Sequence, residues 1–237
     1  MRPIGFSTGA IAKGDFRRAL AMLAPFRLPA VELSALRLDE LPYLAEAAGE
    51  LDLAGYRHVS VHAPSNFSLK DEQRVVGLLR GFVARGWPVV VHPDVIFTDA
   101  LWVEFRNNLL IENNDKRKPV GRTAAELAVL FGRFPEAGLC FDVGHARQID
   151  PTMNEAYLIL QHGQAELRQV HISEVNSFSR HDPLSSAAIE ATRRVADLVP
   201  DHVPVILETL IDQGQSTIEA ELHRASEALI SVLPVGV

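Results

Sequence analysis

Residues 89–92, Val89-Val90-Val91-His92, form an uninterrupted apolar run that closes on a polar side chain, and this pattern decides the fold. An apolar run without alternation is typical of a strand that is buried on both faces of a parallel sheet. Further runs of this kind lie at residues 4–7, 30–33, 59–62, 109–112, 139–142, 169–172 and 205–208. The sequence therefore predicts eight buried strands.

The segments between these runs have the spacing of amphipathic helices. In residues 71–85, the side chains of Val75, Leu79 and Phe82 fall on one helical face. Residues 122–134 begin with a capping-box pattern from Thr123 to Glu126. The same pattern at residues 216–219 predicts a last helix that runs to about residue 233. Residues 95–106 form the shortest crossover.

Strands that alternate with helices predict a single (β/α)8 barrel, a TIM barrel, over residues 1–237. The interval between strands is roughly 30 residues, which suits a strand followed by a crossover helix. The alternative is an open doubly wound sheet. Neither G-x-G-x-x-G nor G-x-x-x-x-G-K-[ST] follows the first run, so a nucleotide-binding version of that sheet has little support.

The composition is that of an ordinary soluble globular protein, since 47% of the 237 residues are hydrophobic and 22% are charged. No apolar run approaches the roughly 18 residues of a transmembrane helix, and the first residues lack the apolar core of a signal peptide. The single cysteine, Cys140, excludes an intramolecular disulfide, so we expect a cytoplasmic protein. The net charge of −7 argues against a broad nucleic-acid-coating surface.

Polar side chains close most of the apolar runs, and the active site of a TIM barrel lies at these strand ends. The residues in these positions are His62, His92, Glu112, Asp142, His171 and Glu208. His145 follows Asp142 in the next turn, and His181 lies in the loop after His171. By contrast, His58 and His202 precede their strands, so we expect them at the opposite end of the barrel.

Imidazole and carboxylate groups together favour a site for divalent metal ions such as zinc, manganese or iron. Carboxylates that are packed into one concave site repel each other unless a cation supplies positive charge. Salt bridges to arginine are the structural alternative. The eight residues are enough for two ions, with one ion or three ions as the alternatives.

Three further polar residues are candidate substrate contacts. Glu32 closes the second run, and its alternatives are a metal ligand or a structural anion. Asn113 follows Glu112 in a position to orient a substrate or, as the alternative, to support a neighbouring metal ligand. Arg180 beside His181 is placed to meet an anion. The basic residues 116–118 are interpreted as a solvated loop, with phosphate contact as the alternative.

Six short motifs occur in order along the chain: His62-Ala63-Pro64, His92-Pro93, Ile111-Glu112-Asn113, Phe141-Asp142-Val143-Gly144-His145, Val170-His171-Ile172 and Leu207-Glu208-Thr209. In these motifs the chain resembles the xylose isomerase-like barrel superfamily, which includes endonuclease IV and many sugar isomerases and epimerases. The resemblance spans nearly the whole chain. It implies a TIM barrel with a metal-dependent active site.

The endonuclease IV pattern implies a ligand set for each ion. By this resemblance, one ion is held by His62, His92 and Glu112. Glu112 bridges to a second ion, whose other ligands are Asp142, His171 and Glu208. A third ion has His145 and His181 as ligands.

The chain departs from the endonuclease IV pattern in two places. That family has an aspartate two residues before the last histidine ligand, where this chain has Ser179, and Asp182 is the candidate substitute. The segments after Ser34 and after His62 also leave little room for long DNA-gripping loops. We therefore expect a small phosphorylated or sugar substrate rather than DNA, no membrane partner, and a homodimer as the alternative to a monomer.

Two reactions compete within this resemblance. The multi-metal pattern implies phosphoester hydrolysis, which is our first expectation. The isomerase and epimerase branch implies one ion, with Glu112 and Glu208 exchanging a proton with the carbon beside a carbonyl and with His145 contacting a substrate hydroxyl. A metal-binding barrel without turnover is the third alternative.

Overall fold

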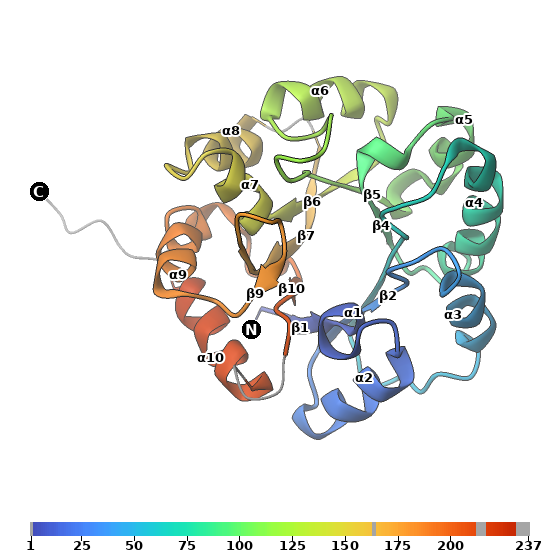
Figure 1. The fold of residues 1–237 in the computed structure, drawn as a ribbon, viewed down its shortest axis with the longest axis horizontal. Helices are drawn as coiled ribbons and strands as arrows, with labels where there is room; N and C mark the ends of the chain where they lie inside the picture. Colours follow the sequence, from blue (N-terminus) through green and yellow to red (C-terminus); the bar gives the residue numbers. More distant parts are fainter. Residues whose placement is uncertain (1, 163–164, 212–216, 231–237) are drawn as a thin grey trace, which may run out of the picture.

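Eight strands close into a parallel barrel in the computed structural model, which describes residues 2–162, 165–211 and 217–230 (Figure 1). The strands are β1 (Ile4–Ser7), β2 (Ala30–Ser34), β3 (His58–His62), β4 (Val89–Val91), β5 (Leu109–Glu112), β6 (Gly138–Asp142), β7 (Leu167–Ile172) and β10 (Val205–Leu207). Strand β1 pairs with both β2 and β10, which closes the barrel. The predicted TIM-barrel fold is confirmed.

Helices surround the barrel on its outside (Figure 1). The α-helices are α1 (Thr8–Ala12), α2 (Phe16–Leu23), α3 (Leu41–Ala47), α4 (Leu69–Val83), α5 (Asp99–Trp102), α6 (Ala124–Arg133), α7 (Val143–Ile149), α8 (Asn154–His162), α9 (Ser186–Arg193) and α10 (Ile218–Ala228). The short 3-10 helices are η1 (Ala24–Phe26), η2 (Pro93–Val95), η3 (Val103–Asn108) and η4 (Ala196–Leu198). None of the helices in the described ranges is long and apolar enough to cross a membrane.

The predicted helices at 71–85 and 122–134 correspond to α4 and α6. Thr123 caps α6, since its Oγ1 accepts from the backbone N–H of Glu126. The Glu126 carboxylate does not complete the capping box; it accepts from the N–H of Arg122 instead. The last helix, α10, ends at Ala228, and the predicted start at Ser216 and the stretch beyond residue 230 lie outside the described residues.

The main core lies between the barrel and the helices. It includes Val89 and Val91 of β4 and Leu79 and Phe82 of α4, all of which are buried. A separate small cluster of Val90, Leu110 and Cys140 lies inside the barrel, because strand side chains alternate between the two faces. Cys140 of β6 is a free cysteine that is buried in this cluster.

One antiparallel pair of short strands was not predicted. Strands β8 (Glu174–Val175) and β9 (His181–Asp182) follow β7 and pair with each other. Each strand has only two residues, so no apolar run marks it in the sequence. The pair carries His181 to the mouth of the barrel.

Candidate metal centre

Six of the predicted ligands come from the C-terminal ends of six strands. His62, Glu112 and Asp142 are the last residues of β3, β5 and β6. His171 lies near the end of β7, whereas His92 and Glu208 directly follow β4 and β10. Because the strands run in parallel, these ends lie at one end of the barrel, and the six side chains meet there.

The Glu112 carboxylate lies at the centre of the group. Its Oε2 atom is 3.0 Å from Nε2 of His62 and 3.0 Å from Nε2 of His92. Its Oε1 atom is 2.9 Å from Nδ1 of His171. One fully buried carboxylate therefore contacts three histidines with its two oxygens.

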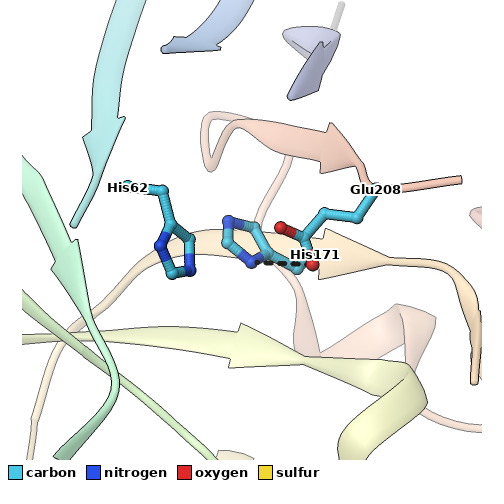
Figure 2. A group of neighbouring side chains, drawn as sticks. All are labelled: His62, His171 and Glu208. Atoms are coloured by element: carbon cyan, nitrogen blue, oxygen red, sulfur yellow. Dashed lines mark ion pairs between the residues drawn. The ribbon is translucent and has the colours of Figure 1, made fainter. Parts of the chain in front are cut away.

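The ligand atoms form three overlapping groups of a size that suits a metal ion, each with its atoms within 4.8 Å of one another. These groups are His62 with His92 and Glu112; Glu112 with Asp142, His171 and Glu208; and His62 with His171 and Glu208. Figure 2 shows the third group, in which Oε2 of Glu208 lies 3.6 Å from Nδ1 of His171. The structure thus brings together the sets predicted for the first and second ions, and Glu112 belongs to both.

The carboxylates of the centre ionise in different ranges. Burial raises the pKa of Glu208 to about 7; His171 opposes this rise, and the charges of Glu112 and Asp142 add to it. Burial also raises the pKa of Asp142. Burial alone would raise the pKa of Glu112 as well, but His92 and His171 outweigh it and hold this pKa well below its ordinary value. Glu112 is therefore a carboxylate at neutral pH, whereas Glu208 titrates near neutrality.

The donor set fits a divalent metal ion. The Oδ2 atom of Asp142 is buried and has no hydrogen-bond partner, which is costly for a carboxylate unless a cation binds it. Burial would lower the pKa of His62, yet the hydrogen bond and the charge of Glu112 raise it to about 9. The carboxylates of the centre thus favour positive charge near them. The nitrogen and oxygen donors are those that bind zinc and manganese in proteins.

His145 and His181 lie beside the centre but outside its three ligand groups. Asp142 caps α7, since its Oδ1 accepts from the N–H of His145 at 2.5 Å. Nδ1 of His145 is 2.9 Å from the backbone oxygen of Asn113, and Nδ1 of His181 is 2.8 Å from Oγ of Ser173. Burial, together with the nearby charge of His145, lowers the pKa of His181 to about 3. His181 is therefore a neutral imidazole.

Among the described residues, no comparable set for a third ion comes together. Oγ of Ser179, at the departing position, lies within hydrogen-bond distance of the Gln148 side chain and of Oδ1 of Asp115. The Asp182 carboxylate, which was the candidate substitute, accepts from the side chain of Asn176 at 2.9 Å. None of the ligand groups within the described residues contains His145, His181 or Asp182.

A cavity of about 160 Å³ opens above the centre. It is lined by Ser34, Ala35, Leu36, His62, Ala63, Ser65, His92, Asp115, Arg117, Lys118, His145, Ser179, His181 and Glu208. Three of these residues, His62, His92 and Glu208, are predicted metal ligands, so the cavity reaches the metal centre. Arg117 and Lys118 line the same cavity, which therefore combines basic side chains with predicted metal ligands.

The three predicted substrate contacts do not line this cavity. The side-chain amide of Asn113 is buried, because it donates to the backbone oxygen of Asp142 and accepts from its N–H. Glu32 is fully buried one layer below the metal ligands. Arg180 is exposed on the turn between β8 and β9. Contact between these side chains and a substrate therefore stays a prediction.

Known structures share this fold. Endonuclease IV from Thermus thermophilus is similar with a TM-score of 0.59 and 20% identity, over 95% of this chain and 97% of that chain. This chain therefore shares the TIM-barrel fold of that enzyme. The apo form of 3-keto-D-glucoside 4-epimerase, YcjR, from E. coli is similar with a TM-score of 0.53 and 15% identity, over 96% of this chain and 99% of that chain. No family model and no curated protein matches the sequence.

Within this fold, Asp115 is a cavity residue that sequence reasoning missed. Its carboxylate accepts from Nη2 of Arg117 at 3.0 Å and from Oγ of Ser179 at 3.3 Å. Burial would raise its pKa, but the hydrogen bonds from Arg117 lower it to about 2. The available signal was its position, since it follows Glu112 and two asparagines at the end of β5.

Proposed function

We propose that this chain is a metal-dependent hydrolase that cleaves a small phosphoester with two divalent ions. The observation that carries the proposal is the shared carboxylate of Glu112, which belongs to two adjacent ligand groups. A bridging carboxylate is how a protein holds two ions close together, and paired ions about 3.5–4 Å apart are typical of enzymes that hydrolyse phosphoesters.

Each part of the centre has a separate role in this proposal. His62, His92 and Glu112 would hold one ion, and Glu112 with Asp142, His171 and Glu208 would hold the other. Ions bound there supply an activated water and neutralise negative charge on the phosphoryl group. The hydrogen bond from Nδ1 of His145 to the backbone oxygen of Asn113 leaves Nε2 of that ring for the substrate.

The cavity supports a small substrate rather than a nucleic-acid duplex. Its volume of about 160 Å³ suits a phosphate group with a compact organic part. Lys118 contacts Asp94 at 2.8 Å and Arg117 contacts Asp115 at 3.0 Å, so both basic side chains are held at the rim by carboxylates. A phosphate would approach two oriented cations there.

A sugar isomerase or epimerase with one ion is the second candidate. Two observations favour it: Glu112, Asp142, His171 and Glu208 form a complete ligand group by themselves, and Glu208 has a pKa of about 7. A carboxyl group that titrates near neutrality suits proton exchange with a carbon acid. The centre would then need His62 and His92 only for substrate contact.

Metal stoichiometry and turnover together test these alternatives. We expect protein reconstituted with Zn²⁺ or Mn²⁺ to hold two ions per chain and to hydrolyse aryl phosphoesters. The variant His92→Ala should hold one ion and lose at least about 100-fold in hydrolysis, because one ligand group loses a donor. His202→Ala, at an exposed position on the opposite end of the barrel, is the matched control and should keep both ions.

The other outcomes separate the alternatives clearly. One ion per wild-type chain would contradict the hydrolase proposal, and deuterium uptake from D₂O into a ketose would then support the isomerase. Two bound ions without turnover on phosphoesters or ketoses would identify a metal-binding barrel that does not catalyse either reaction.

A further inference from the structure

A buried carboxylate lies directly beneath the metal centre, at Glu32 in the middle of β2. Its side chain is fully buried, and three polar side-chain atoms lie within hydrogen-bond distance of its Oε2 atom. Oγ of Ser60 donates to it at 3.2 Å, Nε2 of Gln169 donates to it at 2.7 Å, and Nε2 of His171 lies 3.1 Å away. Glu32 thus contacts a predicted metal ligand from the side that faces away from the ions.

His171 is held by carboxylates at both ring nitrogens. Its Nδ1 faces Glu112 at 2.9 Å and Glu208 at 3.6 Å, whereas its Nε2 faces Glu32. An imidazole binds a metal ion through an unprotonated nitrogen, so its proton must lie on the other nitrogen. The Nε2 proton of His171 therefore needs an acceptor, and Glu32 supplies one.

The neighbouring Gln169 shows why an acceptor at Nε2 determines which nitrogen of His171 carries the proton. Its Nε2 atom lies 2.8 Å from Nε2 of His171 and would donate to that nitrogen if it carried no proton. The ring proton would then sit on Nδ1 and block the ion. The Oε1 atom of Gln169 is 2.8 Å from Nε2 of His58 at the start of β3, and a proton on that nitrogen would hold the amide in this orientation.

The cost of burying Glu32 also points to a role beyond stability. A buried ion costs several kcal/mol unless its partners repay the loss of water. The Oε1 atom of Glu32 is buried without a hydrogen-bond partner, so the fold alone gains little from the charge. A carboxylate that orients a metal-binding histidine is a known means of tuning a site.

We propose that Glu32 is the positioning residue of the metal centre: it accepts the Nε2 proton of His171 and thereby directs Nδ1 of that ring toward the ion shared with Glu112, Asp142 and Glu208. This inference rests on the proposed metal site and extends it by a residue that does not itself bind an ion.

Glu72 provides a closely matched control. It is also fully buried, its Oε1 atom accepts from three donors (Phe97 N, Thr98 N and Trp102 Nε1), and its Oε2 atom has no partner. Its partners lie outside the metal centre. The variants Glu32→Gln and Glu72→Gln therefore remove the same charge from similar surroundings, but only the first removes it from His171.

The experiment measures the affinity of both ions at fixed pH by competition with a chromogenic chelator, and it records the visible absorption of the Co²⁺ form. We expect Glu32→Gln to lower the affinity for the ion at Glu112, Asp142, His171 and Glu208 by about 10- to 100-fold. The absorption spectrum of Co²⁺ bound there should change as well. The ion at His62, His92 and Glu112 should change by less than about threefold. Glu32→Asp, which keeps the charge on a shorter side chain, should fall between wild type and Glu32→Gln, and it serves if Glu32→Gln does not fold.

Two results would overturn the inference, and they differ from a failure of the proposed function. If Glu32→Gln and Glu72→Gln both lower the melting temperature and leave both affinities unchanged, Glu32 is only a structural residue. An equal loss for the two ions would show a general disturbance rather than an effect through His171. If the wild-type chain binds no ion, the metal site itself is wrong, and the inference falls with it.

Discussion

At the scale of single residues, Glu208 is the group whose ionisation the fold changes in a directly measurable way. Burial raises its pKa from the ordinary 4.5 to about 7, with His171 opposing and the charges of Glu112 and Asp142 reinforcing the rise. Between these two pH values the folded state without metal holds a proton that the unfolded state has lost. The contribution of Glu208 to stability therefore falls as pH rises through this window.

We expect Glu208→Gln to be more stable than the wild type in metal-free protein, because an amide avoids this penalty. Its advantage should grow by up to about 1.4 kcal/mol per pH unit between about 4.5 and about 7, and then stay constant. Urea unfolding with EDTA at several pH values measures this difference. Glu46→Gln, at an exposed position of α3 away from the metal centre, is the control variant. An advantage that shrinks with rising pH would refute the raised pKa.

The sequence placed the predicted metal ligands at one end of the barrel, but it did not give the layer of every polar side chain. Parallel strands align their ends, so His62, Glu112 and Asp142 could be placed from the position of each run. Glu32 also closes an apolar run, but β2 continues to Ser34. In the register Ser34 pairs with His62 and Glu32 pairs with Ser60, which puts Glu32 below the mouth. A shift of two residues along a strand changes the layer, and apolar runs do not define strand ends that closely.

At the scale of elements, the junction between β5 and β6 shapes the centre. The side-chain amide of Asn113, just after β5, forms two hydrogen bonds with the backbone of Asp142 at the end of β6. Asp142 in turn caps α7. This junction fixes Asp142 relative to Glu112. Of the two roles expected for Asn113, the hydrogen bonds to Asp142 match the support of a neighbouring metal ligand.

Asn113→Ala should weaken both the fold and the metal site. Two buried backbone groups lose their partner, which costs about 2–3 kcal/mol of unfolding free energy, and the displaced Asp142 should lower the affinity for one ion by at least about tenfold. Asn107→Ala, at an exposed position in η3, is the control and should change neither quantity. Unchanged metal affinity in a destabilised Asn113→Ala protein would show that β6 holds Asp142 without this junction.

At the scale of the whole molecule, the centre exists only if the barrel closes. The ligands range from His62 to Glu208 along the chain, and β1 closes the barrel between β2 and β10. Gly5 in β1 allows this closure: a Cβ atom at its position would lie 1.8 Å from the backbone oxygen of Ala30 in β2. The sequence predicted strand β1 but not this contact, because close backbone approach depends on the curvature of the closed sheet.

Gly5→Ala should therefore destabilise the entire barrel, by about 3 kcal/mol or more, since backbone atoms of β2 must move. Gly77→Ala is the contrasting variant: a Cβ atom there meets nothing within 4 Å on an exposed face of α4, and it should raise stability by up to about 1 kcal/mol. Thermal unfolding and ion binding are measured on both proteins. Because the ligands come from many strands, Gly5→Ala should lose ion binding together with folded structure. A Gly5→Ala protein as stable as the wild type would mean that β1 and β2 do not approach as closely as the closed barrel requires.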